Sequence, residues 1–117
     1  MASRRRLRPA ALTRTLVTAA ATSYAANCTL GASVAAGLLD TRGYRWLHHA
    51  LYIATSALTA AAALALVARG DPSGRTLLPA LIPLAALPRA SARTPGHAWL
   101  GLSAAPFYLL TLRRSWR

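Results

Sequence analysis

The sequence predicts an all-α fold: a small polytopic transmembrane bundle of four helices, in which the third helix is short and kinked by proline. Two observations predict it. Residues 15–39, 46–68 and 94–112 contain no Asp, Glu, Lys or Arg, and runs near twenty residues are long enough to cross a ~30 Å hydrocarbon core. The 14 basic residues, all arginine, fall in short clusters outside these runs. At 117 residues the chain forms a single domain, 1–117.

The first two predicted helices are uncharged but not uniformly apolar. The first covers residues 15–39 and follows a basic N-terminal tail, 1–14. Its hydroxyl residues recur at helical spacing and form one weakly polar stripe: Thr15, Thr18, Thr22, Thr29 and Ser33. The second covers residues 46–68 and ends in a strongly apolar run. A soluble helix needs a charged face, whereas hydroxyl stripes without charge are typical of helix contacts inside a bilayer.

The third predicted helix, residues 76–92, contains Pro79, Pro83 and Pro88. At 1.5 Å per residue it is about 25 Å long, which is slightly short of the hydrocarbon core. Each interior proline removes a backbone hydrogen bond and kinks the helix, and membrane helices tolerate this where neighbours supply new donors to the freed carbonyls. The sequence leaves two alternatives open here: a short kinked crossing, or three crossings plus a re-entrant segment.

The fourth predicted helix covers residues 95–112 and opens with Pro95, a residue suited to a first helical turn. The connections between helices are compact. Residues 40–45 form a polar turn, and residues 69–75 contain Gly, Asp and Pro, which supply turn geometry. Neither connection is long enough to hold a second domain.

The distribution of arginine predicts the topology. Four crossings with the N-terminus inside place ten arginines on the cytoplasmic side and four outside, which satisfies the positive-inside rule. Both termini are then cytoplasmic, and the determining residues are Arg4, Arg5, Arg6, Arg8, Arg113 and Arg114. The N-terminal cluster resembles a twin-arginine export motif, but Arg14 interrupts the approach to the apolar run, which favours an uncleaved anchor.

The use of arginine without lysine, together with abundant alanine, indicates a GC-rich genome. We therefore expect a multi-pass protein of a bacterial cytoplasmic (inner) membrane.

Small residues on the first and fourth helices form candidate packing faces. In lipid, small side chains let helix backbones approach and gain van der Waals contact. The predicted helix-packing residues are Asn27, Gly31 and Ala35, spaced by four, Ser33 and Gly37, also spaced by four, and Gly101 on the fourth helix. We expect Asn27 to form a hydrogen bond across helices.

The three histidines are the candidates for chemistry. By the four-crossing topology, His48 and His97 lie at the outer ends of the second and fourth helices, where they can approach one another and bind a metal or haem iron. No acidic residue is available to support such a site.

Several function classes are excluded by composition. The two acidic residues, Asp40 and Asp71, both lie in turns, which excludes a paired-carboxylate hydrolase and a proton-coupled exporter of the small four-helix kind. The separated arginine clusters, without interleaved aromatic residues, disfavour nucleic-acid binding.

The sequence thus predicts no enzyme and no cofactor. It predicts a non-catalytic accessory or interaction subunit, whose partners are the lipid bilayer and another membrane protein or a second copy. The alternatives are a haem- or metal-binding protein using His48 and His97, and a small pore or transporter lined by Asn27, Tyr52 and the threonine stripe.

Overall fold

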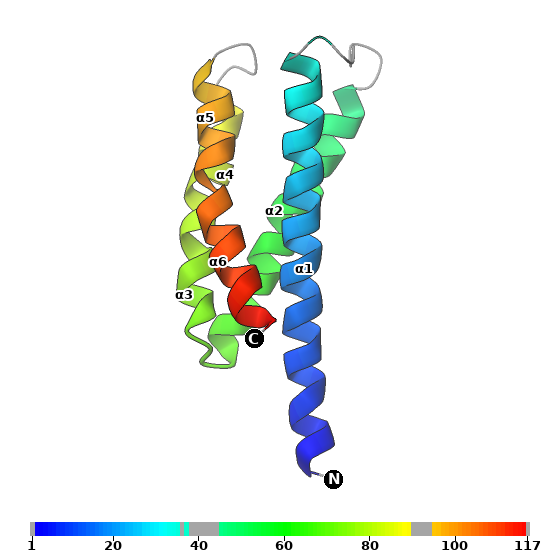
Figure 1. Ribbon diagram of the computed structural model, residues 1–117, viewed down its shortest axis with the longest axis vertical. Coiled ribbons are helices and arrows are strands. Elements are labelled where there is room, and N and C mark those ends of the chain that lie inside the picture. The colour runs from blue at the N-terminus through cyan, green and yellow to red at the C-terminus, as the bar shows by residue number, and fades with distance from the viewer. Residues whose placement is uncertain (1, 36, 38–44, 90–94, 117) are drawn as a thin grey trace.

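The protein is a bundle of four antiparallel helical rods (Figure 1). The computed structural model describes residues 2–35, 37, 45–89 and 95–116, with side chains described within 11–33, 46–88 and 96–116 and at 37. Apart from a few turn residues, the described part of the chain is helical, and it includes no strand. The elements are α1 (Ala2–Ala35), α2 (Arg45–Ala68), a third rod of α3 (Ser73–Leu77), η1 (Leu78–Ala80), α4 (Leu81–Ala86) and η2 (Leu87–Arg89), and a fourth rod of α5 (Pro95–Ser103) and α6 (Ala105–Ser115).

Successive rods run in opposite directions, so both termini lie at the same end (Figure 1). Rods adjacent in sequence pack side by side, and α6 packs against α1 to close the ring. The molecule is elongated, 54 × 23 × 20 Å, and the first turns of α1 extend beyond the other rods. The third rod runs along the bundle in one direction and does not turn back on itself. The all-helical, four-helix part of the prediction is therefore confirmed.

Helix α1 differs from the predicted bounds of 15–39 at both ends. It begins at Ala2, so the predicted N-terminal tail is helical, because Arg, Ala and Leu all have high helix propensity. It ends at Ala35, and Gly37 adopts φ +75°. Glycine reaches this left-handed conformation without steric cost and commonly terminates helices in this way.

The turn after α2 is set by Gly70, which has φ +68°. The Gly70 N–H donates to the Val67 carbonyl at 2.9 Å, and the Asp71 N–H donates to the Leu66 carbonyl at 2.9 Å. This pair of bonds is a Schellman motif, which satisfies carbonyls at the helix end. Asp71 Oδ1 then accepts from the Ser73 N–H at 2.9 Å, and α3 begins there. The turn chemistry expected for residues 69–75 is thus present.

The third rod alternates α-helix with 3₁₀-helix, and the 3₁₀ turns contain Pro79 and Pro88. It spans Ser73–Arg89, whereas the sequence predicted 76–92. The 3₁₀ turns rise about 2.0 Å per residue against 1.5 Å in α-helix, so the rod is about 28 Å long. The prolines therefore lengthen the segment as well as kinking it.

The fourth rod breaks at Ala104, between α5 and α6, and Pro106 occupies the first turn of α6. The missing N–H of a proline is tolerated in a first turn, which explains why a new helix begins there. The rod ends at Ser115, beyond the predicted limit of 112. Arg113 and Arg114 lie in its last turn, where positive charge interacts favourably with the helix dipole.

By length and composition, one helix of the described chain qualifies as a membrane span. It is α2 over Trp46–Ala68, with a mean hydropathy of 1.9. The third and fourth rods are divided into shorter helices by their 3₁₀ turns and by the break at Ala104.

Gly74 is the tightest glycine of the fold, because a Cβ atom there would lie 2.8 Å from Val67 Cγ2 and 3.1 Å from the Val67 nitrogen. We expect Gly74→Ala to lower the free energy of unfolding by about 1–3 kcal/mol, the usual cost of overpacking. The matched control is Gly31→Ala, since a Cβ there meets nothing within 4 Å; it should gain up to about 1 kcal/mol of helix propensity. Thermal unfolding followed by circular dichroism in detergent checks both, and an unchanged Gly74→Ala melting temperature would contradict the packing.

Candidate functional site

A chain of hydroxyl groups lies in the centre of the bundle. Ser23 Oγ and Thr55 Oγ1 are 2.7 Å apart, which joins α1 to α2. Thr59 Oγ1 donates to the Thr55 carbonyl at 2.6 Å and lies 2.6 Å from the Tyr108 hydroxyl, which joins α2 to α6. Since the Thr59 proton is used, Tyr108 donates in that bond. Thr55 and Thr59 are completely buried, so this chain of hydroxyl groups runs through a core that is otherwise mostly apolar.

Two tyrosine hydroxyls donate hydrogen bonds to backbone carbonyls near the breaks in the third and fourth rods. Tyr52 donates to the Leu84 carbonyl at 2.6 Å. The helical partner of that carbonyl would be the N–H of residue 88, which is proline. Tyr24 donates to the carbonyl of Gly101, in the last turn of α5, where carbonyls lack helical partners. The predicted rescue of proline-freed carbonyls by neighbouring helices is therefore present at Leu84.

The rings of Tyr24 and Tyr108 stack, with centroids 4.3 Å apart and planes 14° apart. They belong to the buried cluster that joins α1 to the fourth rod. The sequence analysis did not pair the two tyrosines, because no local pattern relates a residue of the first helix to one of the fourth. Several hydroxyl groups of the predicted polar path donate to backbone carbonyls, namely those of Thr15, Thr18, Thr29, Ser33 and Tyr52.

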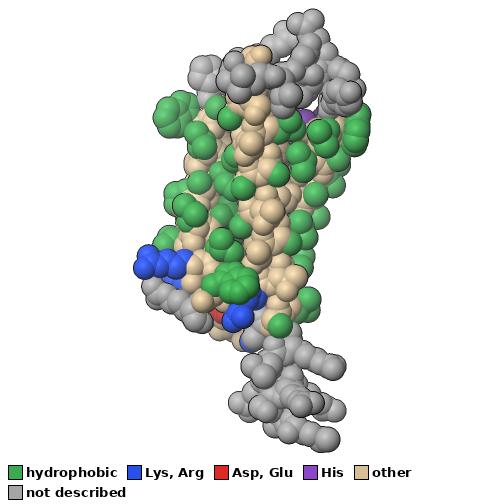
Figure 2. Space-filling model, turned by 45° about the vertical axis from the view of Figure 1, so that its right-hand side comes forward, with side chains coloured by type: hydrophobic (Ala, Val, Ile, Leu, Met, Phe, Trp, Pro, Cys, Tyr) green, Lys and Arg blue, Asp and Glu red, His purple; other side chains and the backbone are tan. Residues whose placement is uncertain are grey.

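The outer surface is apolar over the middle of the bundle (Figure 2). Ile82 is 73% exposed, Leu64 and Leu109 are each 67% exposed, and Ile53 is 64% exposed. We name the following exposed side chains the apolar belt: Ile53, Leu64, Val67, Leu78, Ile82, Leu102, Leu109 and Leu110. Large apolar side chains are thus exposed on the second, third and fourth rods.

Three of the predicted helix-packing residues are glycines with open space beside them. A Cβ added at Gly31, Gly37 or Gly101 would meet nothing within 4 Å. Gly37 lies beyond the end of α1, and Gly101 contacts α1 through its carbonyl. Asn27 Oδ1 is buried without a hydrogen-bond partner.

The remaining members of the packing set lie on the upper part of α1. Ser33 Oγ donates to the Thr29 carbonyl of its own helix at 2.8 Å. Ala35 ends α1, and its side chain lies outside the described residues. A packing role against another chain stays a prediction for all six.

His48 and His97 approach each other, as the sequence predicted, with ring centroids 6.3 Å apart and planes 47° apart. They come from α2 and α5, at the end of the bundle opposite the termini. His49 is exposed on the surface beside them. Three or more His, Cys, Asp or Glu side chains in metal-binding range are absent from the described part of the chain.

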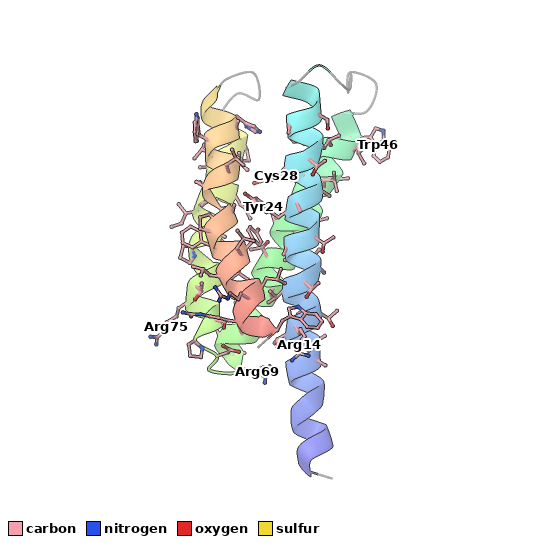
Figure 3. All side chains as sticks on the ribbon, in the orientation of Figure 1. Arg14, Tyr24, Cys28, Trp46, Arg69 and Arg75 are labelled. Atoms are coloured by element: carbon pink, nitrogen blue, oxygen red, sulfur yellow. The ribbon has the colours of Figure 1, made fainter. Side chains whose placement is uncertain are left out.

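The end that carries the termini is basic, and we name it the basic end. Its arginines bind neutral oxygens: Arg69 Nη1 donates to Thr13 Oγ1 at 2.7 Å, and Arg114 Nη1 donates to Thr76 Oγ1 at 3.0 Å. Arg69 and Arg75 point outward there (Figure 3). Of the predicted topology determinants, Arg113 and Arg114 are exposed in α6, and Arg4, Arg5, Arg6 and Arg8 lie in α1 with side chains outside the described residues.

A clamp joins Arg14 of α1 to the C-terminal end of α6. Arg14 Nε donates to the Ser115 carbonyl at 3.0 Å, and its guanidinium carbon lies 4.9 Å from the Trp116 ring centroid. Trp116 Nε1 donates to Thr18 Oγ1 at 3.0 Å. The sequence analysis did not predict this clamp, because about a hundred residues separate its two sides.

The clamp closes one end of a groove of about 590 Å³ on the flank of the bundle. Helix α1 forms the floor of the groove, and about two of its side chains per turn line the groove. Helix α2 contributes Leu51. Its lining residues include Arg14, Thr15, Ala19, Thr22, Ala26 and Trp116.

Comparison with protein families, curated proteins and solved structures finds no match to this chain. The conclusions about function therefore come from the geometry alone.

We expect Tyr108→Phe and Thr59→Val each to lower the free energy of unfolding by about 1 kcal/mol, because each removes the same buried hydrogen bond. The double variant should lose about 0.5–1 kcal/mol less than the sum of the two. Thr29→Val is the control, since Thr29 Oγ1 is exposed and bonds only the Ala25 carbonyl of its own helix. Additive losses in denaturant unfolding would show that the two hydroxyls are not coupled.

Proposed function

We propose that the chain is a small polytopic protein of a bacterial cytoplasmic membrane, with both termini cytoplasmic, and that it serves as a non-catalytic accessory or interaction subunit. The observation that carries the proposal is the exposure of large apolar side chains around a core that includes buried hydroxyl groups. Hydroxyl groups such as Thr55 and Thr59 are buried, while the apolar belt is exposed. In water this arrangement would leave a large unfavourable apolar surface. In a bilayer the apolar belt would contact lipid acyl chains, which are also apolar.

The lengths of the rods support four crossings. At 1.5 Å per residue, Trp46–Ala68 spans about 33 Å, and the fourth rod from Trp99 to Trp116 spans about 26 Å. The third rod, at about 28 Å with its 3₁₀ turns, is of the same length as the ~30 Å hydrocarbon core. Trp46, Trp99 and Trp116 are all exposed, and indole rings favour the membrane interface.

The charges support the orientation. Arg14, Arg69, Arg75, Arg113 and Arg114 lie at the basic end, together with the N-terminal arginines of α1, and positive residues favour the cytoplasmic side. The opposite end carries His48 and His97. This polarity agrees with cytoplasmic termini.

The part of α1 near its C-terminal end, from Asn27 to Ala35, supports an interaction role. Exposed positions there hold only small side chains, such as Thr29, Gly31 and Ala32, whereas the other rods expose large apolar ones. Small residues allow a second transmembrane helix to approach closely. Asn27 lies beside this surface, but its Oδ1 is buried within the chain and has no hydrogen-bond partner there, so the hydrogen bond expected across helices is not formed through this atom.

The membrane proposal predicts that the protein stays in the pellet after alkaline carbonate extraction and is released by detergent. Reporter fusions after residues 72 and 117 should report the cytoplasm, and fusions after residues 42 and 92 the outer side. Recovery in the supernatant without detergent would overturn the proposal. Fusions after 72 and 92 that report the same side would show that the third rod is re-entrant.

The interaction role is tested by purification in mild detergent. The protein should be recovered with a membrane partner or as a dimer, and Gly31→Leu should reduce that association by closing the small-residue surface. Ala57→Leu, at an exposed position of α2, is the matched control. Recovery of the unaltered protein as a lone monomer would contradict the role.

A second candidate function is metal binding, favoured by the 6.3 Å separation of the His48 and His97 rings. Imidazole nitrogens are good ligands for Zn²⁺, Ni²⁺ and Cu²⁺. Purified protein should then bind about one Zn²⁺ per chain by elemental analysis, and His48→Ala or His97→Ala should abolish it. His49→Ala should retain the metal. Equal retention by all three variants would dismiss the site, and a Soret band in the visible spectrum would identify haem instead.

A further inference from the structure

The groove beside α1 has the length of one membrane leaflet. From Arg14 to Ala26 it runs about 18 Å along the helix, compared with half of a ~30 Å hydrocarbon core. Its walls are mostly apolar, and the α1 residues that line it are small: Thr15, Ala19, Thr22 and Ala26. It opens along its length to the surroundings of the bundle, so a chain-like apolar molecule can lie in it.

Arg14 sits at the end of the groove nearest the cytoplasm. Its Nε is held by the Ser115 carbonyl and its guanidinium plane lies against Trp116, so the cation is fixed in place. Within the described part of the chain, Arg14 has no carboxylate partner. The terminal guanidinium nitrogens are therefore available as donors, and guanidinium binds a phosphate group in bidentate geometry.

We propose that this groove binds one anionic phospholipid of the cytoplasmic leaflet, with the lipid phosphate on Arg14 and one acyl chain along α1 between Thr15 and Ala26. The inference rests on the proposed membrane location. It adds a defined ligand class and a binding site to that location.

The charge around the groove selects an anionic headgroup over a zwitterionic one. Arg69, Arg75, Arg113 and Arg114 lie at the same end, and Asp71 is the single acid of the described residues. A net positive potential attracts phosphatidylglycerol and repels the choline of phosphatidylcholine. Trp116 lies at the interface depth, where its indole stabilises the headgroup region.

The dimensions favour a lipid over a second copy of this chain. The groove ends near Ala26 and Leu51, after about half of a ~30 Å hydrocarbon core, which is the reach of an acyl chain within one leaflet. The fixed cation at one end also matches a phosphate, and the outer surfaces of the rods offer no acidic side chain to replace it among the described residues.

The test is native mass spectrometry of the full chain in mild detergent, with phosphatidylglycerol or phosphatidylcholine of identical acyl chains added. The unaltered protein should retain one phosphatidylglycerol about tenfold more than phosphatidylcholine. Arg14→Gln should reduce the retention about tenfold, the loss of one charge-assisted phosphate contact. Arg75→Gln removes an equal charge from the same end but outside the groove, and it should change retention less than twofold.

A second pair of variants keeps Arg14 in place and tests the acyl-chain part of the site. Ala26→Leu fills the groove and should lower phosphatidylglycerol retention, whereas Ala57→Leu, exposed on α2 away from the groove, should not. Equal retention of both lipids, or equal losses for Arg14→Gln and Arg75→Gln, would overturn the proposal. Displacement of the lipid by millimolar inorganic phosphate would overturn it in favour of a free-phosphate site, and a dimer that excludes lipid would overturn it in favour of a second copy.

The outcomes separate this inference from the proposed function. If the protein is membrane-integral by carbonate extraction but shows no lipid preference, the proposed function stands and the proposed lipid site is overturned. If the protein is recovered in the supernatant without detergent, both the proposed function and the proposed lipid site are overturned.

Discussion

The structure depends on how backbone carbonyls are satisfied where the third and fourth rods are broken. A buried carbonyl without a donor costs on the order of 1–3 kcal/mol, and more in an apolar medium. Tyr52 supplies a donor to the Leu84 carbonyl, which Pro88 leaves free, and Tyr24 supplies one to Gly101 at the end of α5. Because both donors come from the two continuous helices, the broken rods are stable only beside α1 and α2, in the register that these bonds set.

Hydroxyl groups also bond one another within a core that is otherwise mostly apolar. Thr59 donates to the Thr55 carbonyl and accepts from the Tyr108 hydroxyl, which joins α2 to α6. The outward positions are left to apolar side chains such as Ile82 and Leu109. Water solvates such an apolar outer surface poorly, and lipid solvates it well. The exposed apolar side chains therefore support the proposed membrane location.

The two ends of the bundle are chemically different. The basic end combines arginine with the Arg14–Trp116 clamp, and this clamp ties the last residues of the chain to α1. The opposite end brings His48 and His97 together across the bundle. The groove begins at the clamp, so the contact that fastens the C-terminal end also places a cation where a lipid phosphate would lie.

Sequence alone determined what depends on local chemistry. Charge-free runs and turn residues predicted four helices, the prolines predicted a kinked third rod, and the order of the helices predicted that His48 and His97 approach. Two features were decided only by the tertiary structure: the Arg14–Trp116 contact and the Tyr24–Tyr108 contact. Helical periodicity can be recognised within a few residues of sequence. Partners such as Arg14 and Trp116, in contrast, meet only once four rods have packed in a particular order and register.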